Sequence, residues 1–140
     1  MVGVVVAAHG RMAEALVATA EGIAGKLENV TVVNVAPCDG LESGRRQIAD
    51  AIARVEGGDG VLLLVDMFGG TPSNCCLTQL ESGQLEVVTG VNLPMLLKLA
   101  TSRTPGATLR ETAEAVLAYG QKNVLLASDL LRARCSAARP

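Results

Sequence analysis

The sequence contains very few aromatic residues: one tyrosine, one phenylalanine and no tryptophan in 140 residues. Recognition by stacking on nucleic-acid bases or on sugar rings is therefore not expected. The core has to be built from Val, Leu, Ile, Ala and Met instead, and the hydrophobic share of 49% is enough for one substantial core. This length and composition predict a single domain.

The sequence also lacks a charge excess and a long apolar segment. Twelve Lys and Arg against fourteen Asp and Glu give a net charge of -2, and no basic run is present that could follow a phosphate backbone, so no nucleic-acid partner is expected. The longest apolar stretches, such as residues 61–65, fall far short of the ~20 residues that cross a bilayer. No basic leader precedes the first apolar run. These absences predict a cytoplasmic protein with no direct membrane insertion.

Metal and disulfide chemistry have little support in the sequence. The four cysteines, at positions 38, 75, 76 and 135, form no C-x-x-C pair, and the chain has one histidine. A zinc site needs more ligands at closer spacing than this. Buried or half-exposed thiols in a reducing compartment fit the pattern better. We therefore expect no metal and no cofactor.

Short apolar runs rich in valine alternate with longer segments of helical period. Strands are predicted at 2–8, 30–36, 61–66 and 85–90, and helices at 12–25, 41–55, 71–81, within 92–103 and from 108 onward. Because the strands are apolar throughout, they should be buried on both faces, which is typical of a parallel sheet covered by helices on both sides. The predicted fold class is α/β, an open doubly wound parallel sheet with the flavodoxin-like strand order 2-1-3-4.

The C-terminal region allows two interpretations. Residues 123–128, "NVLLAS", either continue the last helix or form a short fifth strand, and Gly120 and Asn123 favour a break. The sequence is therefore compatible with a short antiparallel edge strand there. Residues 129–140 show no apolar period, which predicts a flexible tail after a domain that spans residues 1–128.

The only histidine follows the first predicted strand. In open parallel sheets, chemistry occurs beyond the carboxyl ends of the strands, and His9 lies at such an end, directly before Gly10. A neutral imidazole is a usable nucleophile, base or ligand near neutral pH. The alternative is a histidine that only satisfies a backbone group. Its position favours a functional role, and Gly10 would allow close approach to the ring.

A second group of polar residues follows the third predicted strand, in "DMFGGTPSN". Asp66 ends that strand and is placed to accept a hydrogen bond from an imidazole N–H, which would fix the tautomer of the ring. Thr71 and Pro72 have the chemistry of an N-cap and a first-turn proline, and the free N–H groups of a helix start bind anions. The alternative here is a plain loop and helix cap.

One imidazole, one carboxylate and one anion-binding helix start suit phosphoryl transfer onto the imidazole itself. This reaction needs no separate base, because the ring nitrogen is the nucleophile and the protein mainly positions groups and neutralises charge. His9 is the predicted phosphoacceptor and Asp66 the residue that orients it. The predicted phosphate-binding residues are Gly10, Gly69, Gly70 and Thr71. Arg11 either adds a cation or is a solvated residue at a helix start.

Three segments, "VVVAAHGRMAEAL", "VLLLVDMFGGTPSNCC" and "EVVTGVNLPMLLKL", together resemble the IIA domains of the mannose family of the phosphoenolpyruvate-dependent sugar phosphotransferase system. The resemblance runs in order from about residue 2 to 99, and more weakly to 128. It implies that His9 accepts a phosphoryl group from the histidine-containing phosphocarrier protein and passes it to a IIB component for sugar uptake. It also implies that Asp66 orients the ring and that Thr71 lies near the phosphoryl group.

The resemblance further implies a homodimer in which a C-terminal strand is exchanged, with residues 123–128 as the candidate strand. Since this sequence carries no IIB domain, the IIB component is expected on a separate chain or is absent. Phe68 and Ala8 depart from the Trp and the Ser or Thr common in the family, but neither change removes a phosphoryl-transfer group. A regulatory phosphoacceptor of the same fold, which transports nothing, stays open. The phosphocarrier subunit of dihydroxyacetone kinase fits "FGGTPSN" and "GVNLP" less well, and a tetrapyrrole metal chelatase needs more metal-binding side chains than this chain offers.

Overall fold

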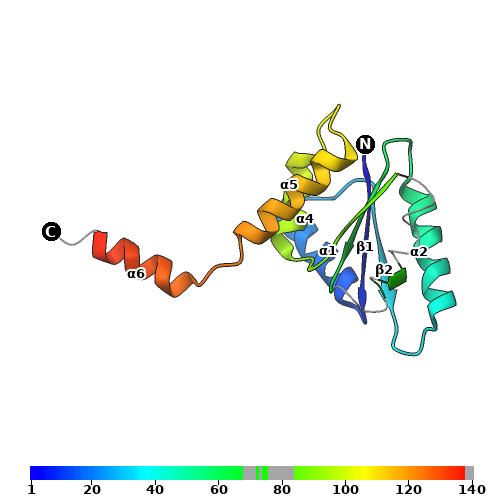
Figure 1. Cartoon of the computed structure of the whole chain (residues 1–140), viewed down its shortest axis with the longest axis horizontal. Coiled ribbons are helices and arrows are strands. Elements are labelled where there is room, and N and C mark those ends of the chain that lie inside the picture. The colour runs from blue at the N-terminus through cyan, green and yellow to red at the C-terminus, as the bar shows by residue number, and fades with distance from the viewer. Residues whose placement is uncertain (68–71, 73, 76–83, 138–140) are drawn as a thin grey trace.

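A computed structural model of the chain describes residues 1–67, 72, 74–75 and 84–137. Helices cover both faces of a single sheet, with α2 on one face and α1, α4 and α5 on the other (Figure 1). The elements are β1 (Gly3–His9), α1 (Met12–Ala24), β2 (Val30–Val35), α2 (Leu41–Val55), β3 (Val61–Val65), β4 (Leu85–Val88), α4 (Leu93–Ser102), α5 (Leu109–Lys122) and α6 (Ala127–Ala137). Most of the helix predicted at 71–81 lies outside the described residues.

The four strands pair in the order β2-β1-β3-β4, and every pairing is parallel. This confirms the predicted fold class and strand order. The register aligns His9 at the end of β1 with Val35 at the end of β2. Because all strands run the same way, their carboxyl ends meet at one edge of the sheet.

The two faces of the sheet bury separate hydrophobic clusters. Val4 and Val6 of β1 face α1, α4 and α5, whereas Val5 and Ala7 face α2. All four side chains are fully buried, as are the side chains of β3. Burial on both sides explains why these strands are apolar without alternation, and the branched side chains suit a pleated, fully covered surface.

Two helix starts show how local sequence sets the element boundaries. Thr108 and Glu111 form a reciprocal capping box at the start of α5, with each side chain accepting from the other residue's backbone N–H. The side chain of Asn92 accepts from the N–H of Met95 at 3.1 Å and caps α4. The capping box confirms the predicted helix start, and both caps satisfy amides that would otherwise have no acceptor.

In the described single chain, residues 123–128 neither continue α5 nor form a short edge strand, the two interpretations that the sequence left open. Residues 124–126 are irregular and α6 begins at Ala127, so within the described single chain this segment adds no fifth strand. Figure 1 shows it leading away from the sheet, which leaves it without a strand to pair with. Val124, Leu125 and Leu126 are 74%, 62% and 69% exposed. The predicted tail 129–140 begins inside α6, a helix with no buried residue, and the domain boundary at 128 stays a prediction.

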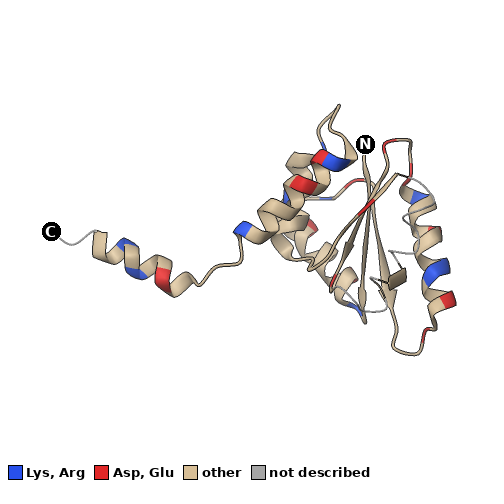
Figure 2. Ribbon diagram, in the orientation of Figure 1, with Lys and Arg blue, Asp and Glu red and all other residues tan. Residues whose placement is uncertain are grey.

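The surface charges are mixed. Figure 2 shows acidic and basic residues interspersed on α2 and α5, and in this view they do not gather into one extended basic face. No helix among the described residues is long and apolar enough to span a membrane.

Candidate functional site

His9 is the last residue of β1 and lies at the carboxyl edge of the sheet. Its strand is paired with β2 on one side and with β3 on the other. The preceding residues of β1 are buried, but the imidazole is 46% exposed. The fold therefore fixes the backbone of His9 firmly while leaving the ring open to an incoming molecule.

Asp66 follows β3 directly and contacts His9 through two hydrogen bonds. The carboxylate oxygen Oδ2 lies 2.7 Å from the ring nitrogen Nδ1 and 3.0 Å from the backbone nitrogen of His9. The other oxygen, Oδ1, accepts from the backbone N–H of Met67 at 2.9 Å. The Asp66 side chain is only 10% exposed. Its hydrogen bonds hold the carboxylate between the end of β1 and the residue that follows it after β3.

The contact with Asp66 determines which ring nitrogen is available. An ionised carboxylate can only accept hydrogen bonds, so Nδ1 must be the donor in this pair. In the neutral imidazole the unprotonated nitrogen is then Nε2, whose lone pair is free to attack an electrophile. The carboxylate also places a negative charge beside the ring. This charge stabilises any positive charge that the ring gains during a reaction.

The pKa of Asp66 reflects two opposing effects. Burial raises the pKa of this carboxyl, because it disfavours the charged form. Hydrogen bonds from the backbone N–H and the ring of His9, and from Met67, stabilise the carboxylate and together outweigh burial, so the pKa is lowered overall. Asp66 is therefore ionised at neutral pH, as its role as an acceptor requires.

The short connection after His9 is tied to the sheet on its other side as well. Gly10 has a φ of +59°, in the left-handed region that a side chain would disfavour, and its N–H donates to the carbonyl oxygen of Val35 in β2 at 3.0 Å. The connection is thus held by β2 on one side and by Asp66 after β3 on the other. Of the other predicted phosphate-binding residues, Gly69, Gly70 and Thr71 lie outside the described part of the chain.

The segment "TGVNLPM", which begins at the end of the fourth predicted strand, has a supporting role in the described structure. The N–H of Val91 donates to the carbonyl oxygen of Val65, directly before Asp66, at 2.9 Å. Asn92 caps α4 and also donates through its amide to the carbonyl oxygen of Gly120 at 3.2 Å. This segment therefore holds the end of β3 and connects α4 with α5.

Sequence reasoning missed Asn34 of β2. Its side-chain oxygen accepts from the backbone N–H of Glu14 at 3.3 Å, and its amide donates to the Glu14 carboxylate at 3.3 Å. Glu14 lies in the first turn of α1 and also pairs with Arg11. The available signal was a lone polar amide in the otherwise apolar run "VVNVA", one residue before the end of β2.

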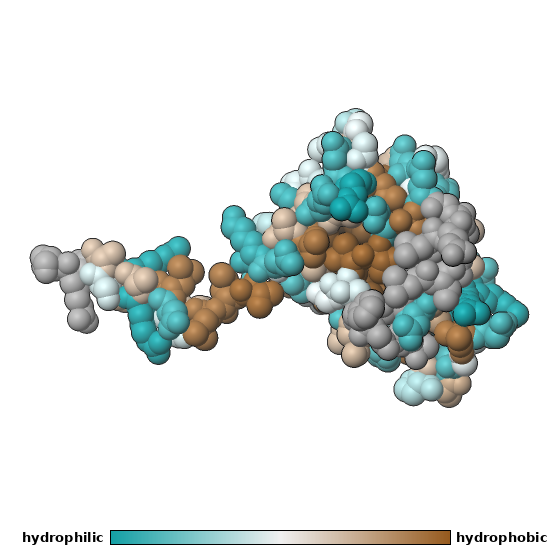
Figure 3. All heavy atoms as spheres, in the orientation of Figure 1, coloured by the Kyte–Doolittle hydropathy of each residue, from teal (hydrophilic) through white to brown (hydrophobic). Residues whose placement is uncertain are grey.

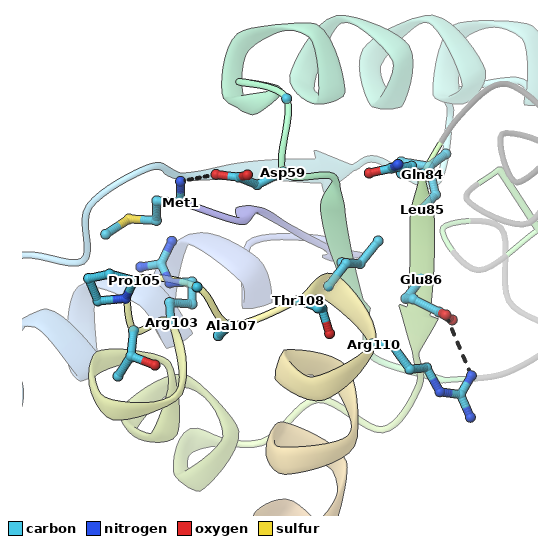
Figure 4. Close-up of a pocket in the computed structure, with 14 residues that line it drawn as sticks. Met1, Asp59, Gln84, Leu85, Glu86, Arg103, Pro105, Ala107, Thr108 and Arg110 are labelled. Atoms are coloured by element: carbon cyan, nitrogen blue, oxygen red, sulfur yellow. Dashed lines mark hydrogen bonds and ion pairs between the residues drawn. The ribbon is translucent and has the colours of Figure 1, made fainter.

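A cavity of about 780 Å³ lies at the opposite, amino end of the sheet. Figure 4 shows Asp59, Gln84 and Glu86 on one side of it, and Arg103, Thr108 and Arg110 on the other. Neither His9 nor Asp66 lines it, so its size does not mark the histidine site. Across residues 1–67, 72, 74–75 and 84–137, no group of three or more His, Cys, Asp or Glu side chains is placed to hold a metal ion.

Comparison with known proteins places this chain in a family. Residues 3–117 match the family model EIIA-man, described as the PTS system fructose IIA component, where PTS is the phosphotransferase system. The mannose-specific EIIAB component of Escherichia coli K12 is 31% identical over 124 residues, which are 88% of this chain and 38% of that protein. The fructose-specific EIIA component of Bacillus subtilis 168 is 29% identical over 94% of this chain and 90% of its own length.

Solved structures agree with this assignment. The mannose/sorbose-specific IIA subunit from Enterococcus faecalis is 30% identical, covers 89% of this chain and 92% of its own, and superposes with a TM-score of 0.81. The component EIIA from Streptococcus agalactiae, at 24% identity, shares the fold with a TM-score of 0.83 over 92% of this chain and 99% of its own. The chain belongs to the mannose family of phosphotransferase-system IIA components, which act in sugar phosphotransfer.

Proposed function

We propose that the protein is a phosphocarrier that accepts a phosphoryl group on Nε2 of His9 and passes it on. The observation that carries this proposal is the 2.7 Å contact between Nδ1 of His9 and Oδ2 of Asp66, because it leaves Nε2 as the unprotonated nitrogen of a half-exposed ring. In this proposal the phosphoryl donor is the histidine-containing phosphocarrier protein. The acceptor is a separate IIB component, and the site of action is the cytoplasm.

The proposed transfer needs no external base. The lone pair of Nε2 attacks the phosphorus of the donor's phosphohistidine, a new N–P bond forms, and the electron pair of the broken N–P bond returns to the donor's ring nitrogen. Phosphorylation at Nε2 while Nδ1 keeps its proton leaves the His9 ring cationic. The Asp66 carboxylate then stabilises that positive charge. Asp66 therefore favours the reaction in two ways: it keeps the proton on Nδ1, and its negative charge stabilises the phosphorylated ring. Transfer to the acceptor is the same exchange in reverse.

The predicted phosphate-binding residues are part of this proposal. Gly10 supplies a backbone free of side-chain bulk next to the ring. Gly69, Gly70 and Thr71 are proposed to bind the phosphoryl oxygens, on the basis of the sequence pattern and the family resemblance. Charge neutralisation by backbone N–H groups would suit a transition state with charge spread over its oxygens.

Labelling with radioactive phosphoenolpyruvate tests the function directly. Purified protein is incubated with enzyme I and the phosphocarrier protein, and labelled protein is counted after acid-free separation. Wild type should be labelled and His9→Ala should not, whereas Asp59→Asn at the opposite end of the sheet should behave as wild type. Labelling of His9→Ala as strong as wild type would disprove the proposal.

The same labelled protein identifies the next step. A IIB component added afterwards should remove the label from His9 and become labelled itself. Relatives carry the names of mannose-, fructose- and sorbose-specific components, so IIB components of these classes are the ones to test. A label that stays on this protein with every IIB component would instead support the regulatory phosphoacceptor of the same fold.

We also propose that the protein is a homodimer that exchanges its C-terminal segment. Figure 3 shows hydrophobic residues along the segment that links α5 to α6, and Val124, Leu125 and Leu126 are well exposed there. Among the described residues β4 pairs only with β3, so a strand from a second copy could pair with its other side. Light scattering should give a dimer for the full chain and a monomer after truncation at residue 122. A full chain that is monomeric at all concentrations would refute the dimer.

A further inference from the structure

An exposed arginine close to His9 in the chain forms an ion pair at the start of α1. Arg11 is two residues after His9, and its side chain is 85% exposed. Its guanidinium reaches both carboxylate oxygens of Glu14, with Nε 3.2 Å from Oε2 and a terminal nitrogen 3.5 Å from Oε1. An ion pair this exposed adds little to stability because both groups are well hydrated. In the arrangement that the structure shows, the guanidinium of Arg11 faces the carboxylate of Glu14.

Glu14 is in turn fixed by Asn34, which belongs to the sheet. The two hydrogen bonds between these residues use both polar atoms of the Asn34 side chain. Asn34 pairs in register with Ala8, the residue before His9. Its position is therefore set by the same strand pairing that sets the position of the histidine.

Asn34 also replaces a missing helix cap. Arg11 occupies the N-cap position of α1 but makes no side-chain cap hydrogen bond. The amide that such a cap would bind, that of Glu14 at the third helical position, donates to Asn34 instead. One side chain from β2 thus fixes both the backbone and the carboxylate of Glu14, and through that carboxylate the guanidinium of Arg11.

We propose that Asn34 is a positioning residue for recognition of the phosphoryl donor, and that it acts through Glu14 to present Arg11 to the phosphorylated face of that protein. This inference rests on the proposed phosphocarrier function. Any donor must bring a doubly charged phosphoryl group up to Nε2 of His9, and so past the residues that flank it. A guanidinium is well suited to such an anion, because it offers several donors in a fixed plane.

The test is a steady-state measurement with the phosphorylated phosphocarrier protein as the varied substrate. Arg11→Ala should raise KM about three- to tenfold with kcat little changed, as expected for a charge at the rim of an interface. Asn34→Leu, which removes both hydrogen bonds to Glu14, should raise KM in the same direction. The KM ratio of Arg11→Ala to wild type should shrink at high salt, because screening weakens the contact in wild type.

A pair of conservative variants separates positioning from simple structural support. Asn34→Asp keeps an acceptor for the Glu14 N–H but sets two carboxylates against each other, so it should raise KM although the cap survives. Adding Glu14→Gln to Asn34→Asp restores a donor opposite the new carboxylate. The glutamine oxygen then stays opposite the terminal nitrogen of Arg11, whereas Nε of Arg11 loses its acceptor. The double variant should therefore recover a KM closer to wild type than Asn34→Asp alone. This comparison also applies if Asn34→Leu fails to fold.

Arg110→Ala is the matched control, because Arg110 is an exposed arginine paired with Glu114 four residues along a helix and lies at the other end of the sheet. Its KM should equal that of wild type. Loss of thermal stability in the Asn34 variants with KM unchanged would overturn the inference, as would an unchanged KM in Arg11→Ala. Labelling that does not depend on His9 would instead overturn the proposed function itself, so the two failures are distinguishable.

Discussion

The contact between Asp66 and His9 gives the sharpest prediction, and Asp66→Asn is the perturbation that tests it. The substitution keeps the size and shape of the side chain but removes its charge. An asparagine that keeps its oxygen at the Oδ2 position still accepts from both nitrogens of His9 but brings no negative charge. An asparagine that turns its NH2 group there faces the backbone N–H of His9 and requires Nδ1 to accept, which moves the ring proton to Nε2. Because Nε2 is the proposed nucleophile, this variant should be phosphorylated slowly even though the fold is kept.

The size of the effect follows from the hydrogen bonds that the carboxylate makes. Two oxygens of Asp66 accept from the backbone and ring nitrogens of His9 and from the backbone of Met67, whereas an asparagine has one oxygen. At least one N–H loses its acceptor, which costs roughly 1–3 kcal/mol when the group is buried. Water can reach the half-exposed His9, so we expect about 1 kcal/mol and a fall in Tm of only a few degrees. The rate of phosphorylation should fall more, by about tenfold at least, as when other residues that orient a histidine are changed.

Two measurements check this prediction together. Rapid-quench labelling gives the rate of phosphorylation, and nitrogen NMR reports the tautomer of the imidazole, with a single ring in the spectrum because the chain has one histidine. Wild type should show a protonated Nδ1 and an unprotonated Nε2, and Asp66→Asn should show a weaker preference for this form. Asp59→Asn serves as the control for loss of a carboxylate elsewhere. If Asp66→Asn were labelled as fast as wild type, Asp66 would have no part in preparing the nucleophile.

Three further predictions concern stability. In Gly3→Ala, the added Cβ would lie 2.8 Å from Cβ of Val55 and closer still to the Val55 carbonyl oxygen, so the strand or α2 must shift. The free energy of unfolding, measured in urea, should fall by about 1–3 kcal/mol. An unchanged unfolding midpoint would contradict this close approach. Thr108→Ala removes the acceptor for the Glu111 N–H and should cost about 0.5–2 kcal/mol, which thermal unfolding can measure, whereas Thr108→Ser should keep most of the cap. The pKa of Asp66 is lowered in the folded state, so its contribution to stability is complete above the ordinary carboxyl pKa of about 4 and is lost as the pH falls through the lowered value. Below pH 4 the unfolding free energy of wild type should therefore fall more steeply than that of Asp66→Ala, and parallel curves would refute the lowered pKa.

The sheet was predictable because its strands carry a strong and simple signal. A continuous apolar run such as residues 2–8 is compatible with burial on both faces, and burial on both faces requires helices on both sides. The observed β1, Gly3–His9, is shifted by a single residue from the predicted strand. The predicted start of α5 was correct for a local reason, since the capping box needs only Thr108 and Glu111 three residues later.

The pairing of His9 with Asp66 was predictable from strand order, because both residues follow strands that become neighbours. Asn34 was not predictable in the same way. Its contact with Glu14 depends on the exact register of β2 against β1 and on where the first turn of α1 lies relative to the end of β2. Neither of these is encoded in a short motif. For the segment 123–128, the sequence pattern indicates a strand that the single chain does not form. Its apolar residues favour a strand, but a strand forms only where an open edge is within reach, and the single chain does not bring the segment to one.

The fixed ring of His9 has a consequence for the order of events in phosphate exchange. Asp66 occupies one nitrogen, so in the proposed function every exchange has to pass through the other. Donor and acceptor would then compete for one small area of surface, and no complex of all three proteins could transfer the group directly. The kinetics should therefore be of the ping-pong type, with parallel lines in double-reciprocal plots when the phosphocarrier protein and a IIB component are varied in turn. Excess of the unphosphorylated carrier should slow delivery to the acceptor, which would make the flow of phosphate sensitive to the ratio of the two partners and not only to their amounts.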